Sequence, residues 1–391
     1  MAHYNVIDVK KYAIFPLFGI LLFLLSCISE YAPEIGNDTA GVLVVEGVIS
    51  DTGTFVKLSR TVKMDDSLSI FESEFVYNAT IHVIDEGFNV IAVAEQQKID
   101  GLTISGTYIV KDSISFTPGK KYALDMQIGG KQYRSDFVTP VFTPEIDEVN
   151  WRLNDDYSID IFVSTHDSEK QINYYLWNFE ENWEYKSWEY AFCWYDPSTK
   201  ILWSTDTIGV NRFFCWDSDY SKRFLLASTI HTNAIIKNHK IHSIQPGTSR
   251  HSYLYCISVR QYGLDRETFR YFDTMQKNVD EVGSLFGLLP AERKGNIQCL
   301  SNPKEIVIGY VFASKQTICR LYIPMAELGL DDFEDTGKIS CGRMIFDNPS
   351  VAFSRGYGNI TPSLYTNLKC VDCTYRGGTK NKPTFWPNNH Q

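Results

Sequence analysis

The sequence lacks the features that would place it in several common classes of enzyme or nucleic-acid-binding protein. It has no G-x-S-x-G nucleophile turn, no H-E-x-x-H zinc motif and no glycine-rich phosphate loop with its lysine. It also has no block of basic residues, and 47 acidic against 37 basic residues give a net charge of −10. Nucleic acid is therefore not expected as a partner. A glycan-degrading enzyme remains an alternative, because two acids far apart in sequence are enough to cleave a glycosidic bond.

The apolar run near the N-terminus is too short to cross a membrane. Tyr12–Leu25 holds 14 mostly apolar residues, whereas a helix that spans a bilayer needs about 20. Lys10 and Lys11 precede this run, and a basic region followed by a short apolar region is typical of a secretory signal. We predict a signal peptide over residues 1–27. The alternative is a buried helix or an N-terminal anchor.

The apolar run ends at Ser26 and Cys27, which resemble the lipobox of bacterial lipoproteins. In such signals the cysteine becomes the first residue of the mature chain and receives acyl chains on its sulfur and its amino group. Each buried acyl CH₂ contributes about 0.8 kcal/mol, so several chains anchor a protein firmly. The sequence thus predicts that Cys27 attaches the chain to membrane lipid, with residues 28–41 as a short tether. The residues after Cys27 also loosely resemble a surface-export signal of Bacteroidota lipoproteins.

Cysteine is absent between residues 28 and 192, so any disulfides belong to the second half of the chain. An exported chain lies in an oxidising compartment, where disulfides persist. Zinc normally needs four converging ligands, and a thioredoxin-like motif needs a βαβ context that the sequence does not indicate. We therefore predict structural disulfides, with free thiols or a metal site as alternatives, and no cofactor. The eight candidates are Cys193, Cys215, Cys256, Cys299, Cys319, Cys341, Cys370 and Cys373.

Strand signals dominate the mature chain and favour an all-β fold. Short runs of β-branched and aromatic residues alternate with turn signals, such as Pro118-Gly119 and Gly129-Gly130, as in a β-sandwich. Tyr122 lies where a tyrosine corner would be. Thr139-Pro140 and Thr143-Pro144 indicate a boundary. We predict an N-terminal immunoglobulin-like β-sandwich over 42–140. A larger β-rich domain with one α-helix and a cysteine-containing tail follows over 146–391, and the tail packs Phe385 and Trp386.

The predicted helix covers residues 266–282. Asp265 can cap its N-terminus, and Leu264 with Phe269 can form a hydrophobic staple. Phe269 and Phe272 begin an apolar stripe at helical spacing. We expect this helix to pack on a sheet, and a partner-binding helix is the alternative.

Aromatic residues are concentrated in YYLWNFEENWEYKSWEYAFCWY, residues 174–195. Because side chains alternate between the faces of a strand, such a run can present an aromatic stripe. Two interpretations stay open: a platform for sugar rings or other flat ligands, and two core strands that pack large rings. The candidate ligand- or partner-binding residues are Trp177, Trp183, Tyr185, Trp188 and Tyr190.

Two further pairs are interpreted as structural. His239 and His242 are three residues apart, but their flanks indicate strand and loop, and no carboxylate lies close by in sequence. We expect a solvated or hydrogen-bonded pair and no metal site. Asp155 and Asp156 lie in NDDYS and are expected at a hairpin tip.

Several stretches together resemble a family of Bacteroidota lipoproteins catalogued as domain of unknown function 4249. They are the lipobox cysteine, LVVEG at 43–47, PGKKYALDMQIGGKQYRSDFVTP at 118–140, GNIQC at 295–299, VIGYVFAS at 307–314 and CVDCTYRGGTKNKPTFWP at 370–387. The resemblance implies an outer-membrane lipoprotein, often encoded near TonB-dependent transporters of the starch-utilisation type. It implies no reaction, no catalytic residue and no binding residue.

The sequence therefore predicts a non-catalytic, lipid-anchored protein exposed on the outer membrane. Its expected role is an accessory that holds a glycan or peptide ligand, or docks on a TonB-dependent barrel, during nutrient uptake. The alternatives are a stand-alone surface adhesin or structural lipoprotein and the glycan-degrading enzyme.

Overall fold

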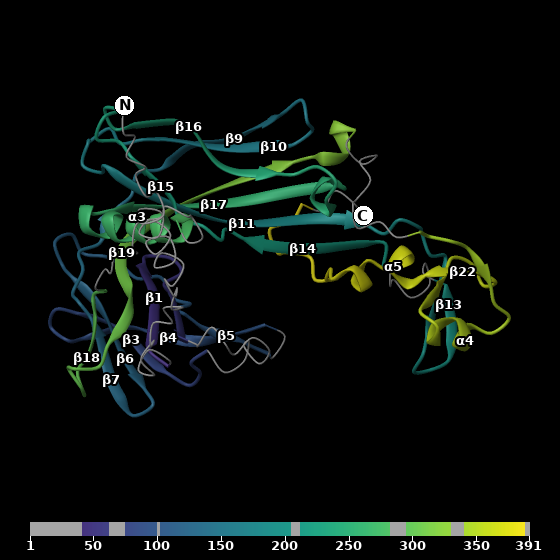
Figure 1. Cartoon of the computed structure of the whole chain (residues 1–391), viewed down its shortest axis with the longest axis horizontal. Coiled ribbons are helices and arrows are strands. Elements are labelled where there is room, and N and C mark those ends of the chain that lie inside the picture. Colours follow the sequence, from purple (N-terminus) through teal and green to yellow (C-terminus); the bar gives the residue numbers. More distant parts are fainter. Residues whose placement is uncertain are drawn as a thin grey trace, which may run out of the picture.

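A single sheet of 14 strands runs through the protein, and it organises both of its large units. The structure is a computed structural model that describes residues 41–61, 75–99, 102–204, 212–281, 295–329 and 340–387. The predicted signal peptide with Cys27, and the predicted tether up to residue 40, lie outside these residues. The sheet order is β14-β11-β17-β19-β1-β2-β5-β4-β3-β6-β7-β18, with β15 and β8 attached at β11 and β19. Figure 1 shows the two units that this sheet joins.

The N-terminal unit is a β-sandwich, because its half of the sheet folds over and encloses one core. Residues from both layers meet in that core, among them Val45, Val56, Ile81 and Leu124, which are fully buried. Its first strands are β1 (Leu43–Ser50), β2 (Phe55–Arg60), β3 (Thr80–Asp85), β4 (Val90–Ile99), β5 (Leu102–Ile109), β6 (Tyr122–Ile128) and β7 (Lys131–Ser135). The predicted immunoglobulin-like sandwich is confirmed.

The turn and the tyrosine contact that the sequence predicts for this unit are both present. Gly129 and Gly130 have φ of +56° and +80°, and they form the tight turn between β6 and β7. The buried Tyr122 hydroxyl accepts a hydrogen bond from the Thr117 amide at 3.0 Å. That bond to the backbone a few residues upstream resembles the contact of a tyrosine corner.

The N-terminal sandwich also takes two strands from far along the chain, so the predicted range 42–140 is incomplete. β18 (Ile297–Cys299) pairs antiparallel with β7. The first half of β19 (Val307–Ile323) pairs parallel with all of β1, and its second half pairs antiparallel with β17. One continuous strand therefore belongs to both units and fixes them to each other.

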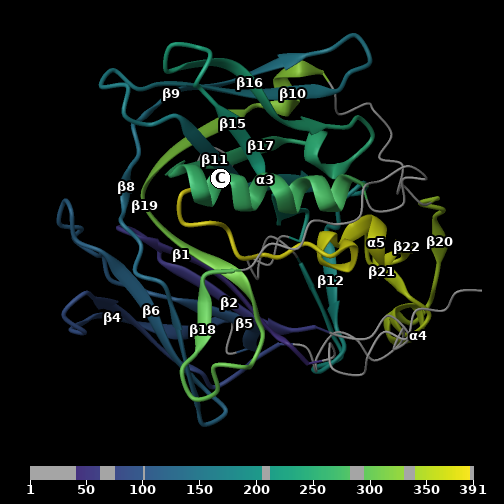
Figure 2. The ribbon, with the colours of Figure 1, turned by 60° about the vertical axis from the view of Figure 1, so that its left-hand side comes forward.

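The second unit is also a sandwich. One layer is β14 (Phe214–Tyr220), β11 (Tyr174–Lys186), β17 (Leu254–Leu264) and the end of β19, with the short β15 (Leu225–Ser228) and β8 (Val141–Phe142) beside it. The other layer is β16 (Ile235–Ile244), β10 (Ile159–His166) and β9 (Ile146–Leu153), and Figure 2 shows it above the main sheet. Asp155 and Asp156 lie in the turn between β9 and β10, as predicted.

Helix α3 (Arg266–Glu281) packs on the opposite face of the main sheet. Its N-terminus forms as predicted, because Asp265 Oδ1 accepts the Thr268 amide at 2.7 Å. Two short helices, α4 (Pro349–Ser354) and α5 (Leu368–Val371), add to the single predicted helix. Within the described residues, no helix has the length and apolar content that crossing a membrane requires.

A small lobe projects beyond the ends of β11 and β14, and Figure 1 shows it at the right. It contains α4 and α5 with β12 (Cys193–Asp196), β13 (Ile201–Ser204), β20 (Met344–Ile345), β21 (Tyr357–Asn359) and β22 (Leu364–Asn367). Cys370 and Cys373 bond to separate partners: disulfides join Cys215 to Cys373 and Cys341 to Cys370. The tail then returns to the main sheet, where Trp386 packs with Leu254 and Cys256 as expected.

Full pairing of the eight cysteines does not occur, since Cys193, Cys256, Cys299 and Cys319 are free thiols. Cys256 and Cys319 lie on neighbouring strands but belong to different cores. Cys256 contacts the Trp386 cluster, whereas Cys319 packs against the core between the two layers. Cys299 lies in the N-terminal core and Cys193 lies in the lobe.

Peptide mapping without reduction should recover the peptides of Cys215 and Cys373 linked, and those of Cys341 and Cys370 linked. Thiol alkylation should label Cys193, Cys256 and Cys299 only after denaturation, because all three are buried. Mass spectrometry of the digested protein checks both expectations. A disulfide that involves Cys193 or Cys299 would contradict the pairing described here.

Candidate functional site

The aromatic stretch forms β11, and most of its candidate residues are core. The exposed fraction is 0% for Trp177, 4% for Trp183 and 1% for Tyr185. All three face the β9-β10-β16 layer, in one cluster with Ile159 and Ile161. The prediction that they form a contact surface is therefore wrong, and the alternative of a core strand that packs large rings is correct for them.

The polar atoms of these rings bond to neighbouring groups inside the protein. Trp177 Nε1 donates to Gln261 Oε1 at 2.9 Å, and Trp183 Nε1 donates to Ser249 Oγ at 3.0 Å. The Tyr185 hydroxyl donates to the Cys373 carbonyl at 3.0 Å. Buried aromatic side chains with a polar end normally find such partners. These contacts orient the rings for packing, and of the three residues only Trp177 also lines the junction cavity described below.

Trp188 and Tyr190 lie past the end of β11, next to the small lobe, and both are half-buried. The Arg376 guanidinium lies 4.1 Å from the centre of the Trp188 ring. Tyr190 contacts Phe192 and Phe213 edge to face. The two rings thus belong to the contact between the lobe and the main sheet and line neither of the two pockets described below.

The best candidate for a ligand site lies instead where the two sandwiches meet. A cavity of about 560 Å³, which we call the junction cavity, opens between the outer face of the N-terminal sandwich and α3. Pockets of about 300–1,000 Å³ at domain interfaces are typical of small-molecule sites. Its lining comes from β1, β2, β11, β17, β19, α3 and the turn after β14. The long sheet therefore provides the floor and α3 provides a wall.

The wall of the junction cavity is a continuous cluster of aromatic rings. Tyr271 of α3 stacks on Tyr310 of β19 with ring centres 4.5 Å apart. Phe272 contacts Phe312 at 5.6 Å and Phe224 at 4.9 Å. Such offset and edge-to-face pairs stabilise one another and hold the rings in place. The cluster is therefore preorganised to receive a flat apolar group.

A few polar groups interrupt this apolar lining. Lys57, Arg223 and Glu46 line the cavity, and Lys222 contributes from the turn where its ammonium pairs with Asp219 at 3.2 Å. Asn178 Oδ1 is buried without a hydrogen-bond partner among the described residues. Buried amide oxygens are normally satisfied, so an unpaired one in a cavity wall points to a partner supplied by a ligand or water.

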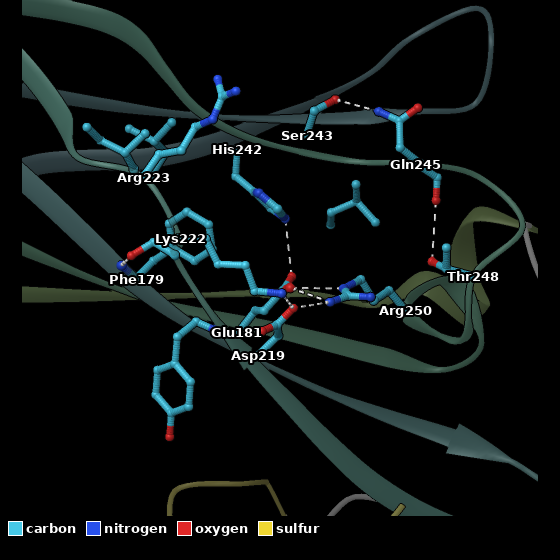
Figure 3. Close-up of a pocket in the computed structure, with 15 residues that line it drawn as sticks. Phe179, Glu181, Asp219, Lys222, Arg223, His242, Ser243, Gln245, Thr248 and Arg250 are labelled. Carbon is cyan, nitrogen blue, oxygen red and sulfur yellow. Dashed lines mark hydrogen bonds and ion pairs between the residues drawn. The ribbon is translucent and has the colours of Figure 1, made fainter. Parts of the chain in front are cut away.

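A second, polar pocket of about 400 Å³ lies across the same turn, between β11, β14 and β16. Glu181 is at its centre and 2% exposed, and Figure 3 shows Arg250 and His242 pointing toward it. Arg250 donates to Glu181 Oε1 from Nε at 3.0 Å and from Nη2 at 2.6 Å, and Nη2 also lies 3.2 Å from Asp219 Oδ2. The Tyr255 hydroxyl donates to Glu181 Oε2 at 2.7 Å, and His242 Nε2 lies 3.2 Å from the same oxygen.

This network keeps Glu181 ionised. Burial alone would raise its pKa, but the contacts with His242 and Arg250 outweigh burial and lower the pKa of Glu181 to about 2. Burial and the Glu181 charge raise the pKa of Tyr255 well above its usual value, so the phenol stays a donor. The pocket is therefore an ion-pair network centred on Glu181 and Arg250. The predicted hydrogen-bonded histidine pair is right only in part, because His242 joins this network while His239 packs on Trp177 at 5.2 Å.

The Glu181 network should make stability fall in acid. A carboxylate whose pKa is lowered by folding stabilises the folded state above its unfolded pKa of about 4.3, and this contribution disappears as pH falls toward its folded pKa of about 2. Between pH 5 and pH 2.5 the expected loss is about 2 kcal/mol, because part of the contribution remains until the pH falls below the folded pKa. Urea unfolding at pH 5 and pH 2.5 measures it. Glu181→Gln should flatten this pH dependence, whereas Glu169→Gln at an exposed position should retain it. If the free energy of unfolding of Glu181→Gln depended on pH as in the wild type, Glu181 would not be the group responsible.

The residues of the junction cavity were not identified by the sequence pattern. Tyr310 and Phe312 lie in VIGYVFAS, and Phe272 belongs to the helix stripe, so each looked like an ordinary core position. The alternation of residues along β1 could have indicated the cavity. Val44, Glu46 and Val48 alternate with the buried core residues of this strand and therefore point to its other face. A strand with apolar residues on both faces needs another structural element packed against each face.

Comparison with known proteins supports the family resemblance and adds no activity. No curated protein matches the sequence. Among solved structures, the chain is similar to the FN1–FN3 domains of chicken CNTN1, with 12% identity over 57% of this chain and a TM-score of 0.18. The match spans 62% of that structure. The family model described as domain of unknown function DUF4249 matches residues 28–319. The chain therefore belongs to the DUF4249 family.

Proposed function

We propose that this protein is a lipid-anchored outer-membrane protein that binds a small ligand and assists a TonB-dependent uptake complex without catalysing a reaction. The observation that carries the proposal is the junction cavity. It is large, lined by an ordered aromatic cluster and positioned between two sandwiches, and it contains an unpaired buried acceptor. These are the properties of a binding site.

The sequence supports the anchor. The lysines, the apolar run and Cys27 occur in the order of a lipoprotein signal, and β1 begins at Leu43. Fully extended, the chain between Cys27 and Leu43 would span at most about 58 Å. Such a tether would keep both sandwiches close to the membrane surface, within reach of a barrel. The resemblance of the sequence to Bacteroidota lipoproteins also leads us to propose a Bacteroidota origin and exposure at the cell surface.

The chemistry of the polar pocket favours binding over catalysis. A general acid for glycoside cleavage needs a carboxyl group that is protonated near neutral pH. Glu181 has its pKa held near 2, and both it and Asp219 contact Arg250. These acids therefore act as fixed charges that stabilise the fold, and the aromatic cavity remains the functional candidate.

A gentle-detergent pull-down of the tagged lipoprotein from its native outer membrane tests the proposal, with mass spectrometry of the proteins that co-purify. A stoichiometric TonB-dependent barrel is the expected result. Cys27→Ser serves as the control, since it should leave the membrane fraction and lose the barrel. Recovery of the lipoprotein alone would contradict the uptake role and favour the adhesin or structural lipoprotein.

A further inference from the structure

We propose that the junction cavity binds an uncharged, flat, hydrophobic molecule, such as a polycyclic aromatic alcohol. This inference rests on the proposed ligand-binding function and names the class of ligand. It differs from the glycan or peptide expected from the sequence. The shape of the cavity, the polarity of its lining and the pairing of its charged groups each support it.

The shape of the cavity favours a flat molecule. The stacked Tyr271 and Tyr310, with Phe272 and Phe312 beside them, form one ordered wall. Phe55 on β2 lines the same space and is 37% exposed. An aromatic ring placed against these side chains can pair edge to face or with offset stacking, which favours it over a round aliphatic group.

The polarity of the lining disfavours a sugar. Most of the residues around the cavity are apolar or aromatic, including Val44, Val48 and Leu176. Each sugar hydroxyl that enters loses its bonds to water and needs a new partner. The inner wall offers chiefly Asn178 Oδ1. A glycan would therefore leave most of its hydroxyl groups unsatisfied.

A chain of hydrogen bonds fixes the Asn178 amide so that its oxygen is the unpaired atom. Gln316 Nε2 donates to the carbonyl and the hydroxyl oxygen of Thr52, which leaves Gln316 Oε1 to accept from the Tyr262 hydroxyl at 3.0 Å. The Asn178 side chain hydrogen-bonds to the same hydroxyl. Since the Tyr262 proton goes to Gln316, the Asn178 amide N–H is the donor in that bond. Oδ1 remains as an acceptor, which suits one hydroxyl or N–H group on a ligand and repels a carboxylate.

The charged groups around the cavity already have partners within the protein. Lys57 of β2 lies directly opposite Glu46 of β1, a position in which unlike charges attract. Lys222 pairs with Asp219 at 3.2 Å, and Arg223 also interacts with another group of the protein. A charged ligand would lose its hydration without meeting an unpaired opposite charge. The cavity therefore favours a neutral ligand over either an acid or a base.

Equilibrium dialysis of the full lipoprotein, with the same detergent on both sides, tests the inference. Three probes share one ring system and differ in charge: neutral 9-anthracenemethanol, anionic 9-anthracenecarboxylate and cationic 9-anthracenemethylammonium. Cyclododecanol is a neutral aliphatic probe of similar size. We expect one molecule of the aromatic alcohol per chain, bound about 10-fold more tightly than either charged probe and about 5-fold more tightly than cyclododecanol.

Glu46→Gln tests the pairing of charges, because it leaves Lys57 without the acid opposite to it. In this variant the carboxylate probe should gain about 3-fold in affinity relative to the ammonium probe. The affinity for 9-anthracenemethanol should stay as in the wild type. Glu86→Gln is the matched control, because Glu86 is an exposed acid that does not line the cavity. It should leave the order of the probes unchanged.

Three further variants assign the binding to the cavity. Ile308→Trp fills the cavity at a side chain that is 40% exposed, so it should fold and lose the aromatic alcohol. It keeps the acyl chains, so it also measures the uptake of probe by lipid and detergent. Phe55→Ala should weaken binding about 5-fold by removing one ring. Phe88→Ala should bind like the wild type, because Phe88 is 59% exposed and does not line the cavity.

The possible outcomes separate this inference from the proposed function. A charged probe that binds as tightly as the aromatic alcohol, in a manner that Ile308→Trp abolishes, would overturn the uncharged class and leave the cavity as a binding site. Cyclododecanol bound as tightly would overturn the flat class in the same way. Failure of all probes to bind, or binding that Ile308→Trp does not change, would overturn the inference as a whole. In each case the pull-down of the barrel tests the uptake role separately.

Discussion

Trp183→Ala should lower the free energy of unfolding by about 3–5 kcal/mol, whereas Trp188→Ala should lower it by about 1 kcal/mol or less. Trp183 is 4% exposed within the core between the two layers. Its removal leaves a cavity, frees Ser249 from a 3.0 Å hydrogen bond and exposes the Arg250 guanidinium that lies 4.0 Å from the ring. Trp188 is half-buried, so its side chain removes less apolar surface from water.

Urea unfolding of the two single variants, followed by circular dichroism, measures this difference. The pair is well matched, because both tryptophans come from the same aromatic stretch and each lies against an arginine. Small and equal effects would restore the interpretation of this stretch as a contact surface. A large effect at Trp183 alone would establish that β11 uses these rings to fold.

Gly309→Ala should destabilise the protein by about 4 kcal/mol or more, which makes it one of the most damaging single substitutions in the chain. Gly309 has φ of +118°, and an added Cβ would overlap the backbone oxygen of Val45 in β1. A Cβ added at Gly295 would likewise overlap the carbonyl oxygen of Gly309. Three backbone segments therefore meet at the point where β19 joins the two sandwiches, and only glycine allows them to approach.

Gly119→Ala is the matched control for this substitution. Gly119 also has a positive φ, +80°, but nothing lies within 4 Å of its added Cβ. It should therefore cost only the strain of a left-handed alanine, about 1–2 kcal/mol. Thermal unfolding of both variants checks the comparison. Equal costs would mean that backbone strain dominates and that the close contact of β19 with β1 is not as described.

Local features of the fold could be predicted from the sequence because neighbouring residues encode them. The Asp265 cap and the stripe that follows it specify α3, and Gly129-Gly130 specifies a hairpin turn. The partners of a strand are not encoded in this way. Val307–Ser314 is far from β1 in sequence, yet it lies beside it in parallel. Alternation of apolar residues identifies each strand and leaves its neighbours open.

The candidate site was harder to predict for the same reason. The aromatic pattern of residues 174–195 correctly indicated strand, but periodicity does not show whether another layer covers the face that carries the rings. The β9-β10-β16 layer covers it, so Trp177 and Trp183 are core. The junction cavity is assembled from residues as distant as Phe55, Tyr271 and Tyr310, which only the path of the long sheet brings together.

Native mass spectrometry of the lipoprotein purified from its own membrane tests the central claim, that the junction cavity holds a ligand, most directly. The wild type should carry an added mass, beyond its acyl chains, of one small molecule per protein. Ile308→Trp should lack this mass, because the indole occupies the cavity. A wild type without any added mass, or the same added mass in Ile308→Trp, would contradict a ligand site at the junction of the two sandwiches.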